Sequence, residues 1–506
     1  MALNNIRFVL GQGGLGRPLP GQDYISGLVF YSATLPSGFS TTNRIKQFFS
    51  VQDAENAGIL ADYNDETQAT GTYTVTAVGT NGNTVTLAVT EPSGKVVLGT
   101  YTKTAAESAV GDVATAIGAA INAGTQSHGY TATVAAAVVT IKARKGLGVF
   151  LNSGTPLTAT VVGTIAGTIA QFTGGVASLQ AVWHYHIAEY FRIQPQGNLF
   201  VGFFAVPGSY TFSEIITLQN YANGAIRQVG IYKDGAAFSA ADITAIHNVC
   251  NTLVSQHKEL IALYAADMAA VTDISTIADL SVLNANLCSA IISQDGAALG
   301  AQLFAAYGKS ITTLGAALGA VALAKVSESI AWVQKFNISN GTECDTLAFA
   351  NGKLFSDASV TDNLLSALQD KRYIFLRKFV GYAGSFFNEN SSAIATTSDY
   401  AYISDNRTIQ KATRGVYVSL VPVLNSPITL NADGTLADTV ITYLETEAER
   451  NLAQMVRDGE LSAEQVVVNP TQNILQTGLL VITVNLVPIG TARNIQVNIG
   501  FNVSIS

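Results

Sequence analysis

The last residues of the chain alternate apolar and polar side chains without a break. In residues 495–506, Ile, Val and Phe occupy every second position, and Gln, Asn, Gly and Ser stand between them. Such a segment predicts a strand of roughly 40 Å at about 3.3 Å per residue, whereas strands usually have about five or six residues. Because this strand overhangs any one small domain, we expect it to pair with another subunit.

A second pattern fills the middle of the chain, where unbroken apolar runs alternate with amphipathic segments. The apolar runs predict buried strands at 198–207, 227–233, 260–266 and 287–293. The amphipathic segments predict helices at 178–193, 213–224 and 239–258. Buried strands alternating with helices indicate an α/β fold, with a mostly parallel sheet covered by helices.

Residues 68–176 differ in composition from the sequence on either side. They are rich in Thr, Val, Ala and Gly and poor in charge. The run 72–90 predicts a hairpin that turns at Asn81-Gly82, because Asn-Gly readily adopts the positive φ angles of a tight turn. A helix is predicted at 112–124 and a strand at 130–143. Since the core pattern resumes afterwards, we interpret this stretch as an inserted β-rich domain.

The whole chain is thus divided into four parts, and its class is α/β, α+β overall. We expect an N-terminal arm at 1–22, an α/β core at 23–67 plus 177–371, the inserted domain at 68–176 and a C-terminal α+β domain at 372–506. In the last part, strands are predicted at 373–380 and 414–424, a helix at 438–458, and long terminal strands after it.

Composition adds that the surface carries unusually few charges. Charged residues make up 12% of the 506 residues, about half the usual share, which suits a surface occupied by copies of the same chain. The net charge of −8 and the lack of a Lys/Arg run argue against nucleic-acid binding. The apolar stretch 310–324 is too short to span a bilayer, so we expect a buried helix of small residues. Three scattered cysteines predict no disulfide framework.

A glycine motif near the start resembles a dinucleotide-binding loop. Gly11, Gly13 and Gly16 have the spacing G-x-G-x-x-G, which needs a helix to begin inside the motif. Pro18 and Pro20 follow instead, and they prevent that helix. We therefore expect no nucleotide and no other cofactor.

Other polar clusters give only weak signals for catalysis or metal binding. On a helix, His184 and His186 point in different directions, so we expect His186 to pair with Glu189 rather than hold a metal. Cys250 lies on an apolar helix stripe. Asp267 and Asp273 follow the strand at 260–266, at the edge of the sheet where α/β folds bind ligands. We expect no catalytic residue and no metal site.

Several segments resemble the tail sheath proteins of contractile-tailed phages and related contractile injection systems. The similarity covers nearly the whole chain and depends on order and spacing rather than on an invariant signature. It is carried by residues 11–31, 50–60, 112–146, 318–337 and 478–504.

This resemblance implies a structural subunit and not an enzyme. Sheath subunits form rings of six, stacked as a helical cylinder around an inner tail tube, and contraction drives the tube through a target envelope. The implied partners are further copies of the chain, the inner tail tube protein, and baseplate and tail terminator proteins, with no nucleic acid and no membrane insertion. The implied location is a virion tail or an assembled injection apparatus, made in the bacterial cytoplasm.

The resemblance also implies that both ends of the chain act as arms that enter neighbouring subunits and complete a shared β-sheet. The implied subunit-contact residues are Ile6, Phe8, Leu10, Gly11, Gly13, Gly16, Leu480, Ile482, Val484, Leu486, Ile495, Val497, Ile499, Phe501 and Val503. On the helix at 438–458, the outer face is a candidate for contact with the tube, through Glu445, Glu449, Arg450 and Arg457. A solvated helix face is the alternative for these four.

Two other functions stay open from the residues alone. One is another self-assembling virion or surface-shell protein, which shares the low charge and the inserted domain. The other is an α/β enzyme with a ligand site near Asp267. The size of the oligomer separates both from a sheath.

Overall fold

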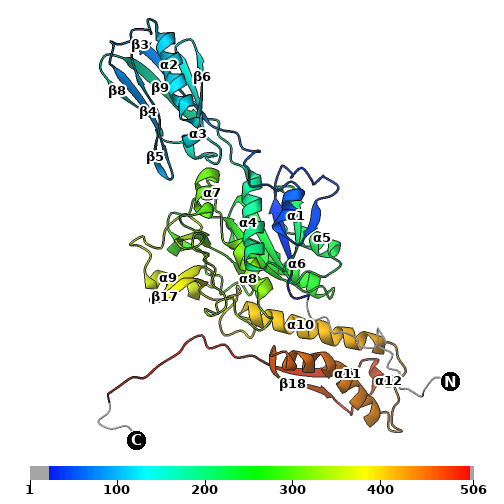
Figure 1. Cartoon of the computed structure of the whole chain (residues 1–506). Helices are drawn as coiled ribbons and strands as arrows, with labels where there is room; N and C mark the ends of the chain where they lie inside the picture. Colours follow the sequence, from blue (N-terminus) through cyan, green and yellow to red (C-terminus); the bar gives the residue numbers. More distant parts are fainter. Residues whose placement is uncertain (1–21, 502–506) are drawn as a thin grey trace, which may run out of the picture.

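The computed structural model describes residues 22–501, which form three parts along the molecule (Figure 1). A helix-covered sheet lies in the middle, the inserted β-rich part at one end, and two long helices with a two-stranded sheet at the other. The expected arm at 1–22 lies almost wholly outside the described residues. The same holds for seven of the expected contact residues, namely Ile6, Phe8, Leu10, Gly11, Gly13, Gly16 and Val503.

The central part is built on a six-stranded sheet in which five strands run parallel. Its order is β13 (Cys288–Ala290), β12 (Ile261–Asp267), β11 (Gln228–Ala237), β1 (Ile25–Tyr31), β10 (Asn198–Phe204) and β2 (Ile45–Phe48). The edge strand β2 runs antiparallel to β10. All seven residues of β1 are buried, as expected for a strand covered on both faces. The predicted α/β class and mostly parallel core are confirmed.

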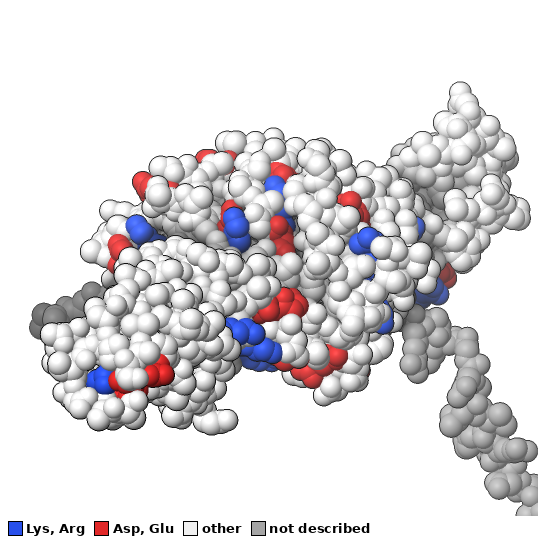
Figure 2. Space-filling model, turned by 90° about the horizontal axis from the view of Figure 1, so that it is seen from above, with Lys and Arg blue, Asp and Glu red and all other residues white. Residues whose placement is uncertain are grey.

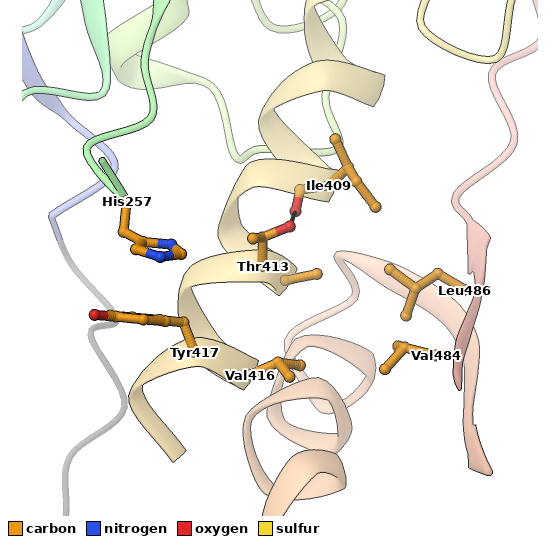
Figure 3. Close-up of a pocket in the computed structure, with 8 residues that line it drawn as sticks. His257, Ile409, Thr413, Val416, Tyr417, Val484 and Leu486 are labelled. Carbon is orange, nitrogen blue, oxygen red and sulfur yellow. Dashed lines mark hydrogen bonds between the residues drawn. The ribbon is translucent and has the colours of Figure 1, made fainter. Parts of the chain in front are cut away.

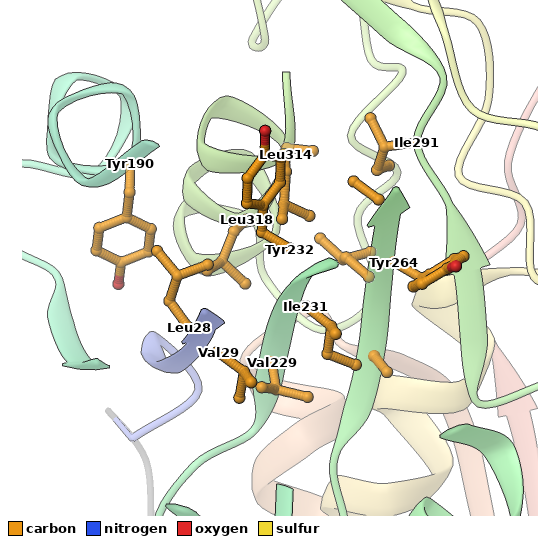
Figure 4. Close-up of a cluster of buried hydrophobic side chains, with 14 of the residues drawn as sticks. Leu28, Val29, Tyr190, Val229, Ile231, Tyr232, Tyr264, Ile291, Leu314 and Leu318 are labelled. Atoms are coloured by element: carbon orange, nitrogen blue, oxygen red, sulfur yellow. The ribbon is translucent and has the colours of Figure 1, made fainter. Parts of the chain in front are cut away.

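Helices cover both faces of this sheet. They are α1 (Val51–Asn56), α4 (Leu179–Ile193), α5 (Glu214–Tyr221), α6 (Ala240–Val254), α7 (Leu299–Tyr307) and α8 (Leu314–Leu323). On one face, Leu28 of β1 lies beside Leu314 and Leu318 of α8 (Figure 4). On the opposite face, Gly27 lies against Leu218 of α5. Ser50 caps α1, because its hydroxyl accepts the Asp53 amide.

The contact between α4 and α8 depends on glycine. A Cβ on Gly315 would lie 2.1 Å from the main-chain oxygen of His186, and one on Gly319 would lie 2.7 Å from that of Tyr190. Residues 314–322 are all buried, which confirms the predicted buried small-residue helix. Among residues 22–501, no helix combines the length and the apolar character needed to cross a membrane.

The inserted part has its own hydrophobic core between two antiparallel sheets. One sheet has the order β6 (Thr131–Ala135), β7 (Val138–Lys142), β3 (Thr70–Ala77) and β9 (Ala166–Thr173), and the other has β5 (Gly94–Thr102), β4 (Thr84–Glu91) and β8 (Leu157–Val162). The helices α2 (Val110–Ala123) and α3 (Thr125–His128) and the short η1 (Phe150–Asn152) complete it.

Two predictions for this part are wrong in detail. The run 72–90 is not a hairpin, because β3 and β4 belong to different sheets. Asn83 accounts for this: its side chain accepts the amides of Thr164 and Ile165 and so ties the connection to another loop. The predicted strand at 130–143 is two strands, β6 and β7, which turn at Ala136 with φ 51°.

The two segments that connect the inserted part to the core lie side by side. Thr67 and Val176 exchange two backbone hydrogen bonds, of 3.1 and 2.8 Å. Next to this bridge, the Asp65 carboxylate accepts the first amides of α4, from Leu179 and Gln180. The Val149 amide also donates to the Ala306 carbonyl at the end of α7, at 2.7 Å.

The chain after α8 first completes the central core and then forms the far end of the molecule. The former segment contains β15 (Leu347–Phe349), α9 (Asp362–Asp370), β16 (Leu376–Phe379) and β17 (Tyr382–Phe387), and β15 pairs with β14 (Ser293–Asp295), which like the short η2 (Ile274–Thr276) comes before α7 in the chain. The latter contains α10 (Ile403–Leu420), η3 (Val421–Val423), α11 (Asp438–Arg457), β18 (Leu461–Val468), α12 (Ile474–Thr477) and β19 (Ile482–Pro488).

The predicted strand at 414–424 is wrong, because these residues form the second half of α10 and the turn after it. Ala412, Val416 and Leu420 are spaced four apart and pack together on the small core between α10, α11 and β18. Their spacing fits a helix face, while Val416, Val418 and Leu420 also fit the period of a strand. Packing against α11 selects the helix.

We expect Gly315→Ala to destabilise the chain by about 1–3 kcal/mol, because the added methyl group overpacks the α4–α8 contact. In an exposed helix the same change is stabilising by up to about 1 kcal/mol, so the sign identifies the close contact. Thermal unfolding measures the difference. Gly490→Ala, where a Cβ meets open space, is the control, and an unchanged melting temperature for Gly315→Ala contradicts the prediction.

Candidate assembly interface

Strands β18 and β19 form an isolated two-stranded sheet at the far end of the molecule. Ile482, Val484 and Leu486 are half-buried and pack toward α10 and α11, while the residues between them are exposed. Within residues 22–501, β19 has β18 as its one strand neighbour. Its other edge therefore offers unpaired backbone groups of the kind that accept an added strand.

An apolar groove of about 340 Å³ lies beside this sheet, between α10 and β19 (Figure 3). Its walls are formed by Ile409, Ala412, Thr413, Val416, Val484 and Leu486. At one end His257 stacks on Tyr417, with ring centroids 3.9 Å apart and planes 17° apart. The groove exposes aliphatic surface next to the open strand edge.

After β19 the chain continues as an extended segment, residues 489–501, which contacts the body through Arg493 and then runs away from it over residues 494–501 (Figure 1). It forms no strand with any other described residue. Ile495, Val497, Ile499 and Phe501 are between 71% and 109% exposed. The alternating apolar positions found in the sequence are thus left in solvent by the single chain.

The other end of the described chain is fixed to α10 by charge. The carboxylate of Asp23 lies 2.7 Å from Lys411 Nζ and 3.3 Å from Arg414 Nη2, and its carbonyl accepts from Arg407 Nη2 at 3.2 Å. Lys411 also pairs with Glu460 at the start of β18, at 2.7 Å. Burial by itself raises the pKa of Asp23, but the charges of Lys411, Arg407 and Arg414 outweigh it and leave the pKa below its ordinary value.

Sequence reasoning missed this cluster. Arg407, Lys411 and Arg414 have the spacing i, i+4, i+7 of one helix face, which is a usable signal. A strand predicted at 414–424 removes Arg414 from that helix face, so the prediction hides the signal. The acidic partner, Asp23, lies almost 400 residues away in sequence, and nothing in its local pattern indicates it.

Helix α11 presents the four candidate tube-contact residues on two different sides. Glu445 faces β18, where it accepts the Val468 amide at 3.0 Å, and Glu449 is half-buried on the same side. Arg450 and Arg457 are exposed, and Arg450 pairs with Glu447 at 3.3 Å. The solvent-facing stripe of α11 is therefore basic and hydroxyl-rich rather than acidic.

The polar clusters considered for catalysis or metal binding are engaged within the chain. The expected pair of His186 and Glu189 does not form: Glu189 binds Arg192 instead, and the fully buried His186 lies among Phe30, Tyr185 and Tyr232. Burial lowers the pKa of His186 to about 3, so the ring is neutral. Cys250, Cys288 and Cys344 are free and buried. In the described part of the chain, no three His, Cys, Asp or Glu side chains are placed to hold a metal ion.

The two acids at the carboxyl end of β12 also have structural partners. Asp267 accepts the amide and hydroxyl of Ser310 at 3.0 and 3.2 Å and lies 3.1 Å from Lys309. Asp273 caps η2 through the Ser275 amide. These contacts fasten loops at the sheet edge.

Charged side chains are sparse on the surface shown in Figure 2, where they occur in small mixed groups separated by uncharged areas. This matches the low charged fraction of the sequence. Such a surface offers many positions for close contact between neutral groups, without one dominant charged patch.

Comparison with protein families gives a match along nearly the whole chain. The model described as DUF2586, N-terminal domain, matches residues 3–391, and the model described as DUF2586, C-terminal domain, matches residues 399–506. No curated protein matches the chain.

Among solved structures, the chain is similar to sheath and baseplate proteins of contractile injection systems, the class of protein that its sequence resembles. The helical sheath of the anti-feeding prophage (AFP) in the contracted state matches with a TM-score of 0.45 and 16% identity, over 62% of this chain and 81% of that one. The AFP baseplate matches with a TM-score of 0.43 and 14% identity, over 63% and 80%. The sheath complex of the extracellular contractile injection system PVC, in the contracted state, matches with a TM-score of 0.41 and 14% identity, over 63% and 80%.

The Asp23 cluster predicts a dependence of stability on pH. Because the pKa of Asp23 is lowered by folding, its contribution is fully present above about pH 4 and is lost as the pH falls further. We expect Asp23→Asn to lower the free energy of unfolding by about 2 kcal/mol at pH 7 and by progressively less as the pH falls below about 4.

Thermal unfolding of both chains between pH 7 and pH 3 checks this. Asp279→Asn is the control, because the exposed Asp279 caps Ser281 through an oxygen that asparagine retains. A difference between Asp23→Asn and the unsubstituted chain that stays constant over the whole pH range contradicts the prediction.

Proposed function

The chain belongs to the DUF2586 family, and we propose that it is the structural subunit of a contractile tail sheath. It assembles as stacked rings around an inner tail tube, and its contraction drives the tube through a target envelope. The observation that carries this proposal is that one molecule has both an open strand edge and an exposed segment with the pattern of a strand. Among residues 22–501, nothing pairs with the open edge of β19, and no sheet takes up the alternating segment 495–501.

The two features complement each other only between different copies. Residues 494–501 run away from the body, so the segment meets the β18–β19 sheet of a neighbour rather than its own. Strand addition satisfies the backbone groups of both partners. Covering the apolar positions of the segment contributes about 1.5–3 kcal/mol for each side chain that becomes fully buried.

A chain that both donates and receives a strand makes a heterologous contact, which generates rings or helical filaments rather than a closed pair. This geometry supports the cylinder of a sheath. In the same scheme, residues 1–22 form the second arm, with Ile6, Phe8 and Leu10 as its apolar positions and Gly11, Gly13 and Gly16 as its bend. Residues 23–67 with 177–371 form the sheath core, 68–176 a domain carried on it, and 372–506 the domain that links subunits.

Contraction requires two packings of the same subunits, of which the contracted one is more stable. Small gains at each contact add up over many subunits, so no single strong interaction is required. The strand links keep the lattice connected while the rings rotate. We assign contact with the tube to the solvent-facing stripe of α11, with Arg450 and Arg457 as its charged members and Glu445 and Glu449 along its flank.

The proposal includes no catalytic step and no cofactor. Asp267 is the candidate ligand-site residue of the alternative enzyme hypothesis, and its carboxylate is held by Ser310 and Lys309. The proposed partners are other copies of the chain, the inner tail tube, and the baseplate and terminator proteins at the two ends of the tail. The proposed location is a virion tail or an assembled injection apparatus.

We expect the purified full chain to form long hollow cylinders in negative-stain electron microscopy, and a chain that ends at Arg493 to form none. The reason is that truncation removes the donated strand and leaves the receiving edge intact. Cylinders from both chains contradict the role of residues 494–506. A full chain that stays small and monodisperse at high concentration and in salt contradicts the sheath.

Point variants separate strand addition from nonspecific effects of charge. Val497→Asp/Ile499→Asp and Gln496→Asp/Asn498→Asp add the same two charges to opposite faces of the segment. We expect the first pair to abolish cylinders and the second pair to retain them, since only the first lies on the apolar face. Equal effects of the two pairs contradict burial of that face.

A further inference from the structure

Among the described residues of the C-terminal segment, Arg493 is the last whose side chain binds the rest of the molecule. Its guanidinium lies 3.4 Å from the centre of the Tyr402 ring, and its Nε lies 3.1 Å from Glu389 Oε2. Arg372 also contacts the Tyr402 ring, at 4.9 Å. Residues 494–501 beyond this point are fully exposed. Arg493 is therefore the root from which the C-terminal segment departs.

Tyr402 is the residue at which α10 begins, since it is the N-cap of that helix. The C-terminal root thus sits on the first turn of α10. The N-terminal root, Asp23, is held on the same helix by Arg407, Lys411 and Arg414. From Tyr402 to Arg414 the helix spans about 18 Å at 1.5 Å per residue.

The receiving sheet is fastened to this helix as well. Lys411, which binds Asp23, also binds Glu460 at the start of β18. Asn451 of α11 donates to the Gly415 carbonyl of α10 at 2.7 Å. Further bonds hold α10 on the central part: Arg407 donates to the Ala324 carbonyl, and Gln410 donates to the Leu260 carbonyl beside β12.

We infer that α10 is the mechanical link between the two arms, with Asp23 and Arg493 as the positioning residues that fasten each arm to it. The inference rests on the proposed sheath function. A pull on the C-terminal arm reaches α10 through Arg493 and Tyr402, and it reaches the N-terminal arm through Lys411, Arg414 and Asp23. The two fastenings act in series, so force between neighbouring subunits passes along one helix.

The first test needs no assembly. Spin labels are placed on Val418→Cys, on the exposed side of α10, and on Asn498→Cys, in the C-terminal segment; the three natural cysteines are buried. Pulsed electron paramagnetic resonance then gives the distribution of distances between the two labels. We expect Arg493→Ala to broaden this distribution, because the segment loses its root. Lys95→Ala, which removes an exposed cation on β5 of the inserted part, away from both roots, is expected to leave it unchanged. An unchanged distribution in Arg493→Ala overturns the role of Arg493.

The second test uses assembled cylinders and the urea concentration at which half of them are lost. We expect Asp23→Asn and Arg493→Ala each to lower this concentration, and the double variant to lower it no further than the more damaging single variant. That lack of additivity is the signature of fastenings in series. Arg414→Gln, which removes one of the two side-chain contacts to Asp23, replaces Asp23→Asn if the latter is poorly folded.

Additive losses in the double variant overturn the link through α10, as does an unchanged midpoint in both single variants. If the unsubstituted chain forms no cylinders, the proposed sheath function fails and the link between arms fails with it. The spin-label experiment still decides whether Arg493 anchors the segment, so the two failures are distinguished.

Discussion

An extended backbone must find hydrogen-bond partners along its edges, and this requirement shapes the whole molecule. In the central sheet it is largely met inside the chain, because the four inner strands each pair on both sides and helices cover both faces. At the far end it is not met, because β18 and β19 have only each other and residues 489–501 have no strand partner among the described residues. The fold is self-sufficient in its centre and incomplete at its end, which is the physical basis for treating that end as an assembly surface.

The two regions differ in how their elements are held. In the centre, glycines allow α4 and α8 to approach so closely that main-chain atoms of one helix meet the other, and burial of apolar side chains supplies the stability. Around α10, ion pairs and hydrogen bonds join segments distant in sequence: Asp23, Glu460 and Arg493 all end on this helix or on its first residue. Such contacts are directional, so they fix the positions of the chain ends more closely than apolar packing does.

Much of this architecture can be predicted from the sequence, because period and composition report local burial. The alternation of apolar runs and amphipathic segments predicts the parallel core, and the small-residue run 310–324 predicts α8. The failures have physical causes. The strand predicted at 414–424 is helical because Val416 and Leu420 satisfy both periods and α11 decides between them. The hairpin at 72–90 is lost because Asn83 binds a distant loop. The Asp23 cluster at the candidate interface is only half visible in the sequence: the basic residues share a helical spacing, but their acidic partner lies almost 400 residues away and has no local pattern of its own.

The connection between the inserted part and the core is short, and this has a consequence for what the core can carry. The chain enters and leaves this part at an isolated bridge between Thr67 and Val176. The distance between the two connections to the core is therefore set by this bridge and not by the residues between them. The core therefore constrains the inserted part at two places: its two ends must lie side by side, and the loop at Val149 meets the end of α7. A different domain with adjacent termini can in principle replace it without a change in the central sheet.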